Sequence, residues 1–300
     1  MPSSSANIQP AAPLAPTESP LPLPVRAISG QEPRPERLGP EPVWIWGLPL
    51  SGVATSQALD LVDDLIRRGQ PSLFIKANLH YAMLTDAHPA LRAVNARAAF
   101  VLPDGMPMVW YSRCIGLALP ERVAGSDLVY LLSERAAARG HRVFLLGGEP
   151  GVAQTAAKIL ADRYPDLQIV GTESPPLRTW TAEENAELIA RIRSARPDLL
   201  LAALGQPKGE LWLDEHCQQM GVPACVQVGA SLDFVAGKAR RAPKWTHRIG
   251  LEWAYRALSE PRRLGPRYIR NAAFLLKAVL RDARAWLGTR VGDRTASSPR

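Results

Sequence analysis

Short apolar runs alternate with segments of helical period through most of this chain, and this alternation constrains the fold more than any other feature. The apolar runs predict strands at Val43–Leu48, Ser72–Ala77, Ala99–Pro103, Arg142–Leu146, Gln168–Gly171, Asp198–Leu204 and Ala224–Gly229. The segments between them predict helices at Ser56–Arg68, Tyr81–Ala96, Ser126–Ala138, Val152–Tyr164, Ala182–Ala195 and Gly209–Met220. Nearly continuous apolar strands separated by helices indicate an α/β fold, with a Rossmann-like, mostly parallel sheet and helices on both faces.

Residues at the ends of these segments support the helix assignments. Ser126 and Thr181 stand where N-caps belong, and Thr181 begins a capping-box pattern. Gly69, Gly140 and Gly221 stand where the glycine after a helix belongs.

The chain divides by composition into four parts. Residues 1–42 hold eleven of the 28 prolines and show no periodicity, which predicts a disordered leader. Residues 43–237 contain the predicted α/β catalytic domain, and residues 238–288 form a basic C-terminal appendage. Residues 289–300 predict a frayed, disordered tail.

All the net positive charge belongs to the last part of the chain. Residues 238–300 contain 16 Lys and Arg and only four Asp and Glu, whereas the whole chain has a net charge of +8. Such a basic block indicates an anionic partner: lipid headgroups, diphosphates or nucleic acid.

The sequence lacks several other signatures. Three cysteines cannot form a disulfide framework, no apolar stretch is long enough to span a bilayer, and the first 40 residues contain no apolar signal segment. We therefore expect a cytoplasmic protein. Without D-x-D, H-E-x-x-H or paired C-x-x-C motifs, we expect no metal and no cofactor.

Ligands of open parallel sheets bind at the carboxyl ends of the strands, so the residues that follow the predicted strands are the candidate site. These residues are Asn78, Asp104, Gly147, Gly148, Gln206, Lys208 and Asp233. Asp104 precedes a glycine and lies beside an apolar segment, which suits a general base, although Asp-Gly is also a common turn.

Other candidates keep two interpretations each. Gly147 and Gly148 open a helix and either cradle a diphosphate or make a tight turn. Gln206 and Lys208 lie in a glycine-bounded turn and are either structural or substrate-binding. Arg122 is either a surface arginine or a ligand of a phosphate leaving group.

The motifs occur in an order that resembles the WecG/TagA/CpsF glycosyltransferase family over roughly residues 44–271. They are Asn78, Leu102–Pro107, Glu121–Asp127, Leu145–Gly148, Leu204–Glu210, Gly229–Phe234, Arg241–Trp245 and Gly250–Trp253. The resemblance implies a metal-independent, inverting transferase of bacterial cell-surface or exopolysaccharide synthesis. It would move a hexose or N-acetylhexosamine from a UDP-sugar to a polyprenyl-diphosphate-linked sugar.

The resemblance also implies roles for individual residues. Asp104 matches the general base of the family, and Asn78, Arg122 and Gln206 match residues of its site. Appendage arginines match Arg256 and Arg263, while Pro266 occupies the place of a third and Arg267 follows it. Lys76 replaces a threonine found two residues before the asparagine in characterised relatives.

Residues 270–288 form a basic amphipathic helix on a helical projection. Arg270, Lys277, Arg281 and Arg284 fall on one stripe, and Leu275, Leu276, Val279, Leu280, Ala283, Trp286 and Leu287 fall on the opposite side, with Phe274 outside this pattern. The pattern predicts a peripheral anchor on an anionic membrane surface, at the inner face of the cytoplasmic membrane. The alternative is a helix packed on its own domain or on a second subunit of a homo-oligomer.

The sequence also has features of two other classes of protein. A nucleotide-dependent oxidoreductase needs a G-x-G-x-x-G fingerprint, which the loop at Gly147 does not provide. A nucleic-acid-binding protein could use the basic C-terminus with Trp245, Trp253, Tyr255 and Tyr268 as stacking groups. The apolar face after Arg270 favours lipid over nucleic acid.

Overall fold

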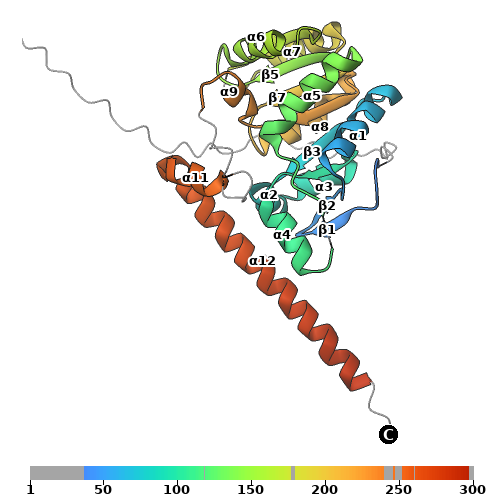
Figure 1. Cartoon of the computed structure of the whole chain (residues 1–300), viewed down its shortest axis with the longest axis vertical. Coiled ribbons are helices and arrows are strands. Elements are labelled where there is room, and N and C mark those ends of the chain that lie inside the picture. Colours follow the sequence, from blue (N-terminus) through green and yellow to red (C-terminus); the bar gives the residue numbers. More distant parts are fainter. Residues whose placement is uncertain are drawn as a thin grey trace, which may run out of the picture. The chain divides into compact units, whose positions relative to one another are not determined.

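A six-stranded parallel sheet forms the centre of the molecule (Figure 1). The computed structural model describes residues 37–117, 119–176, 180–239, 246, 252–259 and 261–296, with the backbone alone for 254, 256, 259, 263 and 285–296, all within one compact unit. The strand order is β4-β3-β8-β7-β5-β6, and every neighbouring pair is parallel. The strands are β3 (Leu73–Ala77), β4 (Val101–Pro103), β5 (Arg142–Gly147), β6 (Gln168–Glu173), β7 (Leu199–Ala203) and β8 (Ala224–Gln227). The predicted α/β architecture is confirmed.

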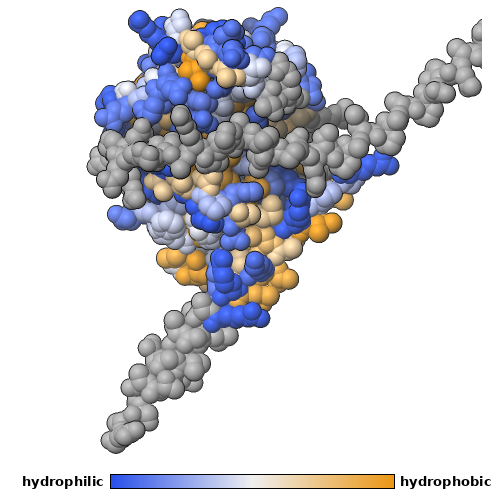
Figure 2. All heavy atoms as spheres, turned by 180° about the vertical axis from the view of Figure 1, so that it is seen from behind, coloured by the Kyte–Doolittle hydropathy of each residue, from blue (hydrophilic) through white to orange (hydrophobic). Residues whose placement is uncertain are grey.

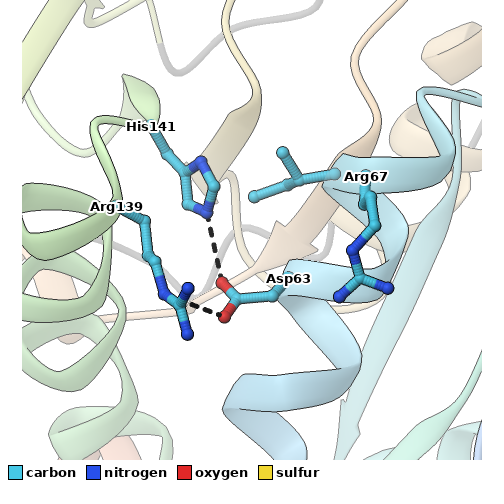
Figure 3. Close-up of a pocket in the computed structure, with 5 residues that line it drawn as sticks. Asp63, Arg67, Arg139 and His141 are labelled. Atoms are coloured by element: carbon cyan, nitrogen blue, oxygen red, sulfur yellow. Dashed lines mark hydrogen bonds and ion pairs between the residues drawn. The ribbon is translucent and has the colours of Figure 1, made fainter.

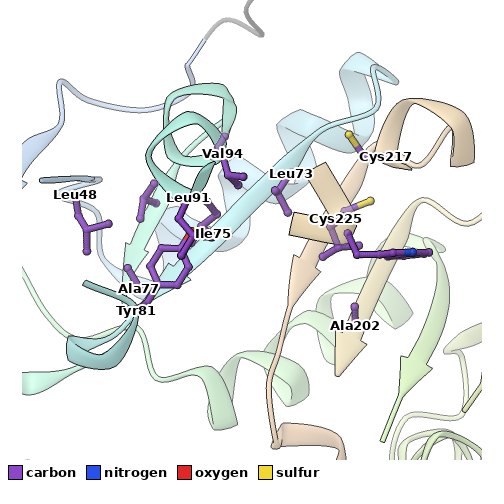
Figure 4. Close-up of a cluster of buried hydrophobic side chains, with 14 of the residues drawn as sticks. Leu48, Leu73, Ile75, Ala77, Tyr81, Leu91, Val94, Ala202, Cys217 and Cys225 are labelled. Carbon is purple, nitrogen blue, oxygen red and sulfur yellow. The ribbon is translucent and has the colours of Figure 1, made fainter. Parts of the chain in front are cut away.

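Helices cover both faces of the sheet. They are α1 (Thr55–Arg68), α2 (Leu79–Ala87), α3 (Pro89–Arg97), α4 (Met106–Cys114), α5 (Gly125–Arg139), α6 (Val152–Arg163), α7 (Ala182–Ala195), α8 (Lys208–Met220), α9 (Ser231–Val235), α11 (Glu252–Ser259) and α12 (Pro261–Ala296). Alternate side chains of each strand enter two different cores. Leu200 and Ala202 of β7 join the core under α2, α3, α7 and α8 (Figure 4), while Leu199 and Leu201 join the core under α1, α5 and α6. Burial on both faces explains why these strands are continuous apolar runs.

The N-terminal strand prediction is wrong in one respect. Val43–Leu48 is not one strand of the main sheet but part of a separate antiparallel hairpin of β1 (Val43–Ile45) and β2 (Leu48–Leu50). Trp46 and Gly47 both have positive φ, of 50° and 79°. Two consecutive residues with positive φ make the tight turn that joins such strands.

The predicted helix Tyr81–Ala96 is divided into α2 and α3. His88 is extended, with φ −120° and ψ 106°, and Pro89 follows it as the first residue of α3. A residue before proline avoids the helical region, and proline is well suited to a first helical position.

The predicted helix ends are mostly confirmed. The Thr181 hydroxyl accepts a hydrogen bond from the Glu184 amide, and Gly69, Gly140 and Gly221 are all left-handed. The prediction of Ser126 as an N-cap is wrong, because α5 begins at Gly125, whose amide donates to the carboxylate of Asp104.

The C-terminal helix α12 packs against the α/β domain through a narrow set of side chains. Leu264, Asn271, Phe274 and Ala278 are buried, and α12 contacts α2. The helix continues to Ala296, so the backbone of residues 289–296 is helical where the sequence predicted a frayed tail. Residues 1–36 of the predicted leader lie outside the described residues. None of the helices described here is both long and apolar enough to cross a bilayer.

Candidate functional site

The predicted site residues collect at the carboxyl edge of the sheet because all its strands point the same way. Asn78 follows β3 and Asp104 follows β4. Gly147 ends β5 and Gly148 comes next, Gln206 and Lys208 follow β7, and Asp233 lies in α9 after β8. The loops of β3 and β4 are neighbours because these two strands pair directly.

Asp104 is anchored at both carboxylate oxygens. Its Oδ1 accepts a hydrogen bond of 2.9 Å from the Gly125 amide at the N-terminus of α5, and its Oδ2 lies 3.2 Å from Nζ of Lys76. Both contacts hold the carboxylate in one orientation. Each oxygen keeps a second lone pair, and 18% of the side chain is exposed. The carboxylate is therefore oriented and still able to accept a proton.

Gly125 makes room for this ion pair. A Cβ atom at position 125 would lie 2.1 Å from Nζ of Lys76 and 2.7 Å from Oδ2 of Asp104. No side chain fits there without displacing the pair, so a glycine at this position has a direct steric reason.

Sequence reasoning named Lys76 only as a departure from relatives and gave it no role. The side chain lies within the buried strand β3, is 7% exposed and forms the ion pair with Asp104. The signal was a lysine inside an otherwise apolar strand, since a lysine at such a position is almost always paired.

Glu210 is a second functional candidate that the sequence did not single out. This residue of the first turn of α8 is 1% exposed, and its Oε1 accepts a hydrogen bond of 3.0 Å from Nε2 of Gln206. Burial raises the pKa of Glu210 to about 7, against smaller opposing effects of hydrogen bonds and the charge of Lys76. Its Oε2 is buried without a hydrogen-bond partner among the described residues. Glu210 thus orients Gln206 and can hold a proton near neutral pH.

Asn78 has a local structural role. Its Oδ1 caps α2 by accepting a hydrogen bond of 3.0 Å from the Tyr81 amide. The side-chain amino group of Asn78 points away from this cap bond and can still donate to a ligand.

His80, two residues later, joins α2 to α12. Its Nδ1 lies 3.1 Å from Oδ1 of Asn271. Burial, followed by the positive charge of Arg267, lowers the pKa of His80 to about 4, and Arg270 adds to this effect. His80 is therefore neutral at pH 7, and its Nδ1–H donates to Asn271.

The predicted appendage arginines are described only in part. Arg267 is half-buried on α12, whereas the side chains of Arg256 and Arg263 lie outside the described ones.

Arg122 joins the loop before α5 to α11. Its Nη1 lies 3.3 Å from Oε2 of Glu252, and each of the two side chains is 14% exposed. The guanidinium has further N–H groups beyond the one that faces Glu252.

The glycine loop after β5 packs closely on β7. A Cβ at Gly147, whose φ is 103°, would lie 2.5 Å from the Ala203 carbonyl oxygen, and the Gly148 amide donates to that same oxygen at 3.1 Å. These contacts explain structurally why both positions are glycines.

Lys208 follows β7 as the first residue of α8. Its Nζ lies 4.6 Å from the ring centroid of Trp180, and burial lowers the pKa of this lysine.

A cavity of about 320 Å³ lies away from this edge, near the start of β5 (Figure 3). It is lined by Asp63, Ile66, Arg67, Arg139 and His141, and Asp63 accepts from Nε2 of His141 at 3.1 Å and lies 3.7 Å from Nε of Arg139. The charged groups of this cavity have partners among the described residues, because Asp63 also pairs with Arg135, and Arg67 pairs with Asp64. Within the described part of the chain, no group of three or more His, Cys, Asp or Glu side chains could hold a metal ion.

Comparison with known protein families identifies the family. The family model of the WecG/TagA/CpsF glycosyl transferases matches residues 43–287, which include the whole sheet, Asp104, Glu210 and the docked part of α12. The chain therefore belongs to the WecG/TagA/CpsF family of glycosyltransferases, enzymes of cell-surface polymer synthesis.

Proposed function

We propose that this glycosyltransferase moves a hexose or N-acetylhexosamine from a UDP-sugar to a polyprenyl-diphosphate-linked sugar, with inversion and without a metal ion. The observation that carries this proposal is the carboxylate of Asp104, fixed by Lys76 and Gly125 at the sheet edge and still partly accessible. An inverting transfer needs one such base and no nucleophile on the enzyme.

Asp104 takes the proton of the acceptor hydroxyl. The hydroxyl oxygen then attacks the anomeric carbon of the donor from the face opposite UDP, the bond from that carbon to the diphosphate oxygen breaks, and UDP leaves with the electron pair. Lys76 holds the carboxylate in place before the acceptor binds. General-base catalysis of this kind contributes about 10²–10⁴-fold to the rate.

Cationic side chains are assigned to the departing diphosphate. Arg122 lies in the loop beside Asp104, and Arg267 belongs to α12 close to His80. Arg256 and Arg263 are assigned to the same task on the family pattern. Guanidinium groups suit diphosphate because they donate paired hydrogen bonds in one plane.

The remaining site residues are assigned to substrate binding. Gln206 is held by Glu210, the amino group of Asn78 is available, and Lys208 and Asp233 follow neighbouring strands. We assign them to the sugar and nucleotide hydroxyls, and the loop of Gly147 and Gly148 to the nucleotide side.

The acceptor lipid determines where the enzyme acts. A polyprenyl chain lies in the bilayer, so the enzyme is proposed to bind as a peripheral protein at the inner face of the cytoplasmic membrane. The basic, amphipathic α12 provides the attachment.

A donor screen tests the whole proposal. Purified protein is given a panel of UDP-sugars and a polyprenyl-diphosphate-sugar acceptor, with and without EDTA, and products are identified by mass spectrometry. We expect one donor to be consumed equally in both conditions. Activity that EDTA abolishes and Mn²⁺ restores would contradict the metal-free mechanism.

A further inference from the structure

The hairpin, α4 and α12 meet at one end of the molecule. The Trp46 ring centroid lies 4.8 Å from that of Tyr111 on α4 and 6.1 Å from that of Phe274 on α12. The Tyr111 hydroxyl donates to the carboxylate of Asp282. These contacts join three elements that are far apart in sequence into one surface.

Large apolar side chains are exposed on each of these three elements. They are Trp44 on β1, Trp110, Ile115 and Leu117 on and after α4, and Leu276, Val279 and Leu280 on α12, and their exposed fractions range from 37% to 62%. Figure 2 shows apolar side chains gathered at the end of the domain from which the helix continues, with hydrophilic side chains between them. Scattered exposed apolar residues are normal, but a group of this size on adjoining elements marks an interaction surface.

The way α12 docks leaves most of its apolar face uncovered, with Leu275 alone of the face's described leucines packed partly against the core. Asn271, Phe274 and Ala278 face the domain and are buried, whereas Leu276 and Leu280 point elsewhere and are exposed. A helix of a globular protein normally buries its most apolar side against its own core. Here the helix is held by a different side, so domain docking and apolar contact with a partner are compatible.

The charges around this surface specify the partner. Arg113, Lys277 and Arg284 are exposed at its margin, and two acids of neighbouring elements, Asp86 and Asp282, both lie within ion-pair distance of Arg281. A nucleic acid offers no aliphatic surface for the exposed leucine and isoleucine side chains. Pairing this surface with that of a second copy of the chain would bring its cations near the same cations of the other copy. Apolar and tryptophan side chains rimmed by cations fit an anionic lipid bilayer.

We propose that β1, the end of α4 and α12 form one lipid-binding surface, so that the catalytic domain itself enters the bilayer interface through Trp44, Trp110, Ile115 and Leu117. This inference rests on the proposed function and deepens it. Attachment through α12 alone would let the domain and its docked helix roll together about the helix axis on the membrane. A second contact on α4 fixes the orientation of the domain relative to the lipid.

Vesicle co-sedimentation of the full chain tests this surface. The double variant Ile115→Ser/Leu117→Ser removes the α4 contact, and Ile159→Ser, an equally exposed position on α6, is the matched control. On vesicles of equimolar phosphatidylglycerol and phosphatidylcholine, we expect the double variant to bind about tenfold more weakly than the parent, and the control to bind equally. Thermal unfolding must show that both variants fold.

Two results would overturn the inference. Unchanged vesicle binding of the double variant would show that α4 does not touch lipid. A shift of the double variant from dimer to monomer in sedimentation velocity, with vesicle binding intact, would assign the surface to a second copy instead.

Transfer to a short-chain, water-soluble acceptor separates this inference from the proposed function. We expect the double variant to keep that activity. If the parent protein shows no transfer to any acceptor while vesicle binding still depends on Ile115 and Leu117, the proposed function fails and the lipid-binding surface stands.

Discussion

Replacing the buried Glu210 by glutamine is expected to change how the stability of this protein depends on pH. The ordinary pKa of a glutamate is 4.5, whereas burial raises that of Glu210 to about 7. Between these values the folded protein holds a proton that the unfolded chain has released, so the free energy of unfolding decreases as the pH rises. This pKa difference corresponds to about 3 kcal/mol of unfolding free energy in total, most of which falls between pH 5 and pH 8. The Glu210→Gln variant has no carboxyl group at this position, so its free energy of unfolding does not decrease with pH for this reason.

Urea unfolding followed by circular dichroism at pH 5 and pH 8 measures the effect. The glutamine variant should gain about 2–3 kcal/mol relative to the parent between pH 5 and pH 8, whatever its stability at pH 5. Comparison with the parent subtracts the titration of all other groups, provided that these do not contact Glu210. Glu134→Gln, at an exposed position on α5, is the control and should follow the parent at both pH values. Parallel pH dependence of the Glu210 variant and the parent would refute the reasoning.

Three further predictions concern the site and α12. Asp104→Asn should keep the fold and lose about 10²–10⁴-fold in turnover, and near-normal turnover of the purified variant would remove Asp104 from its assigned role. Gly125→Ala should destabilise the protein by about 1–3 kcal/mol in urea unfolding, because the new Cβ displaces Lys76 from Asp104; an unchanged midpoint would contradict the close approach. The pKa of His80 is lowered from 6.5 to about 4. The contribution of neutral His80 to the docking of α12 is therefore complete above pH 6.5 and decreases as the pH falls from 6.5 towards 4. Hydrogen exchange of residues 264–284, corrected for intrinsic rates, should show less protection of α12 at pH 5 than at pH 7.5 in the parent but not in His80→Gln.

Most of the sheet could be predicted from the sequence because its strands are buried on both faces. The runs at Ser72–Ala77, Arg142–Leu146 and Ala224–Gly229 each contain or overlap an observed strand, with the ends differing by one or two residues. The exceptions have local causes. The turn at Trp46 and Gly47 divides one apolar run into a hairpin, and α4 was not predicted because Pro107, its second residue, reads as part of a turn.

The site was predicted only as far as topology determines it. Parallel strands put Asn78, Asp104 and Gln206 at one edge, and the sequence contains that information. It does not contain the pairing of Lys76 with Asp104 or of Arg122 with Glu252, because these contacts join residues that are 28 and 130 positions apart in the chain. Burial of Glu210 was equally hidden, since a glutamate in the first turn of a helix is ordinarily exposed to solvent.

Shortening the chain ahead of α11 would remove more than the proposed membrane contact of α12. The cut removes the carboxylate that faces Arg122, the amide that accepts from His80 and the acid that accepts from Tyr111. Arg122, His80 and Tyr111 remain on the α/β domain. Each becomes exposed to solvent and loses the group that it faced. A fragment of this kind would therefore differ from the whole enzyme in the electrostatics around Arg122 and His80, and poor turnover by the fragment would say nothing about whether membrane attachment is needed for catalysis.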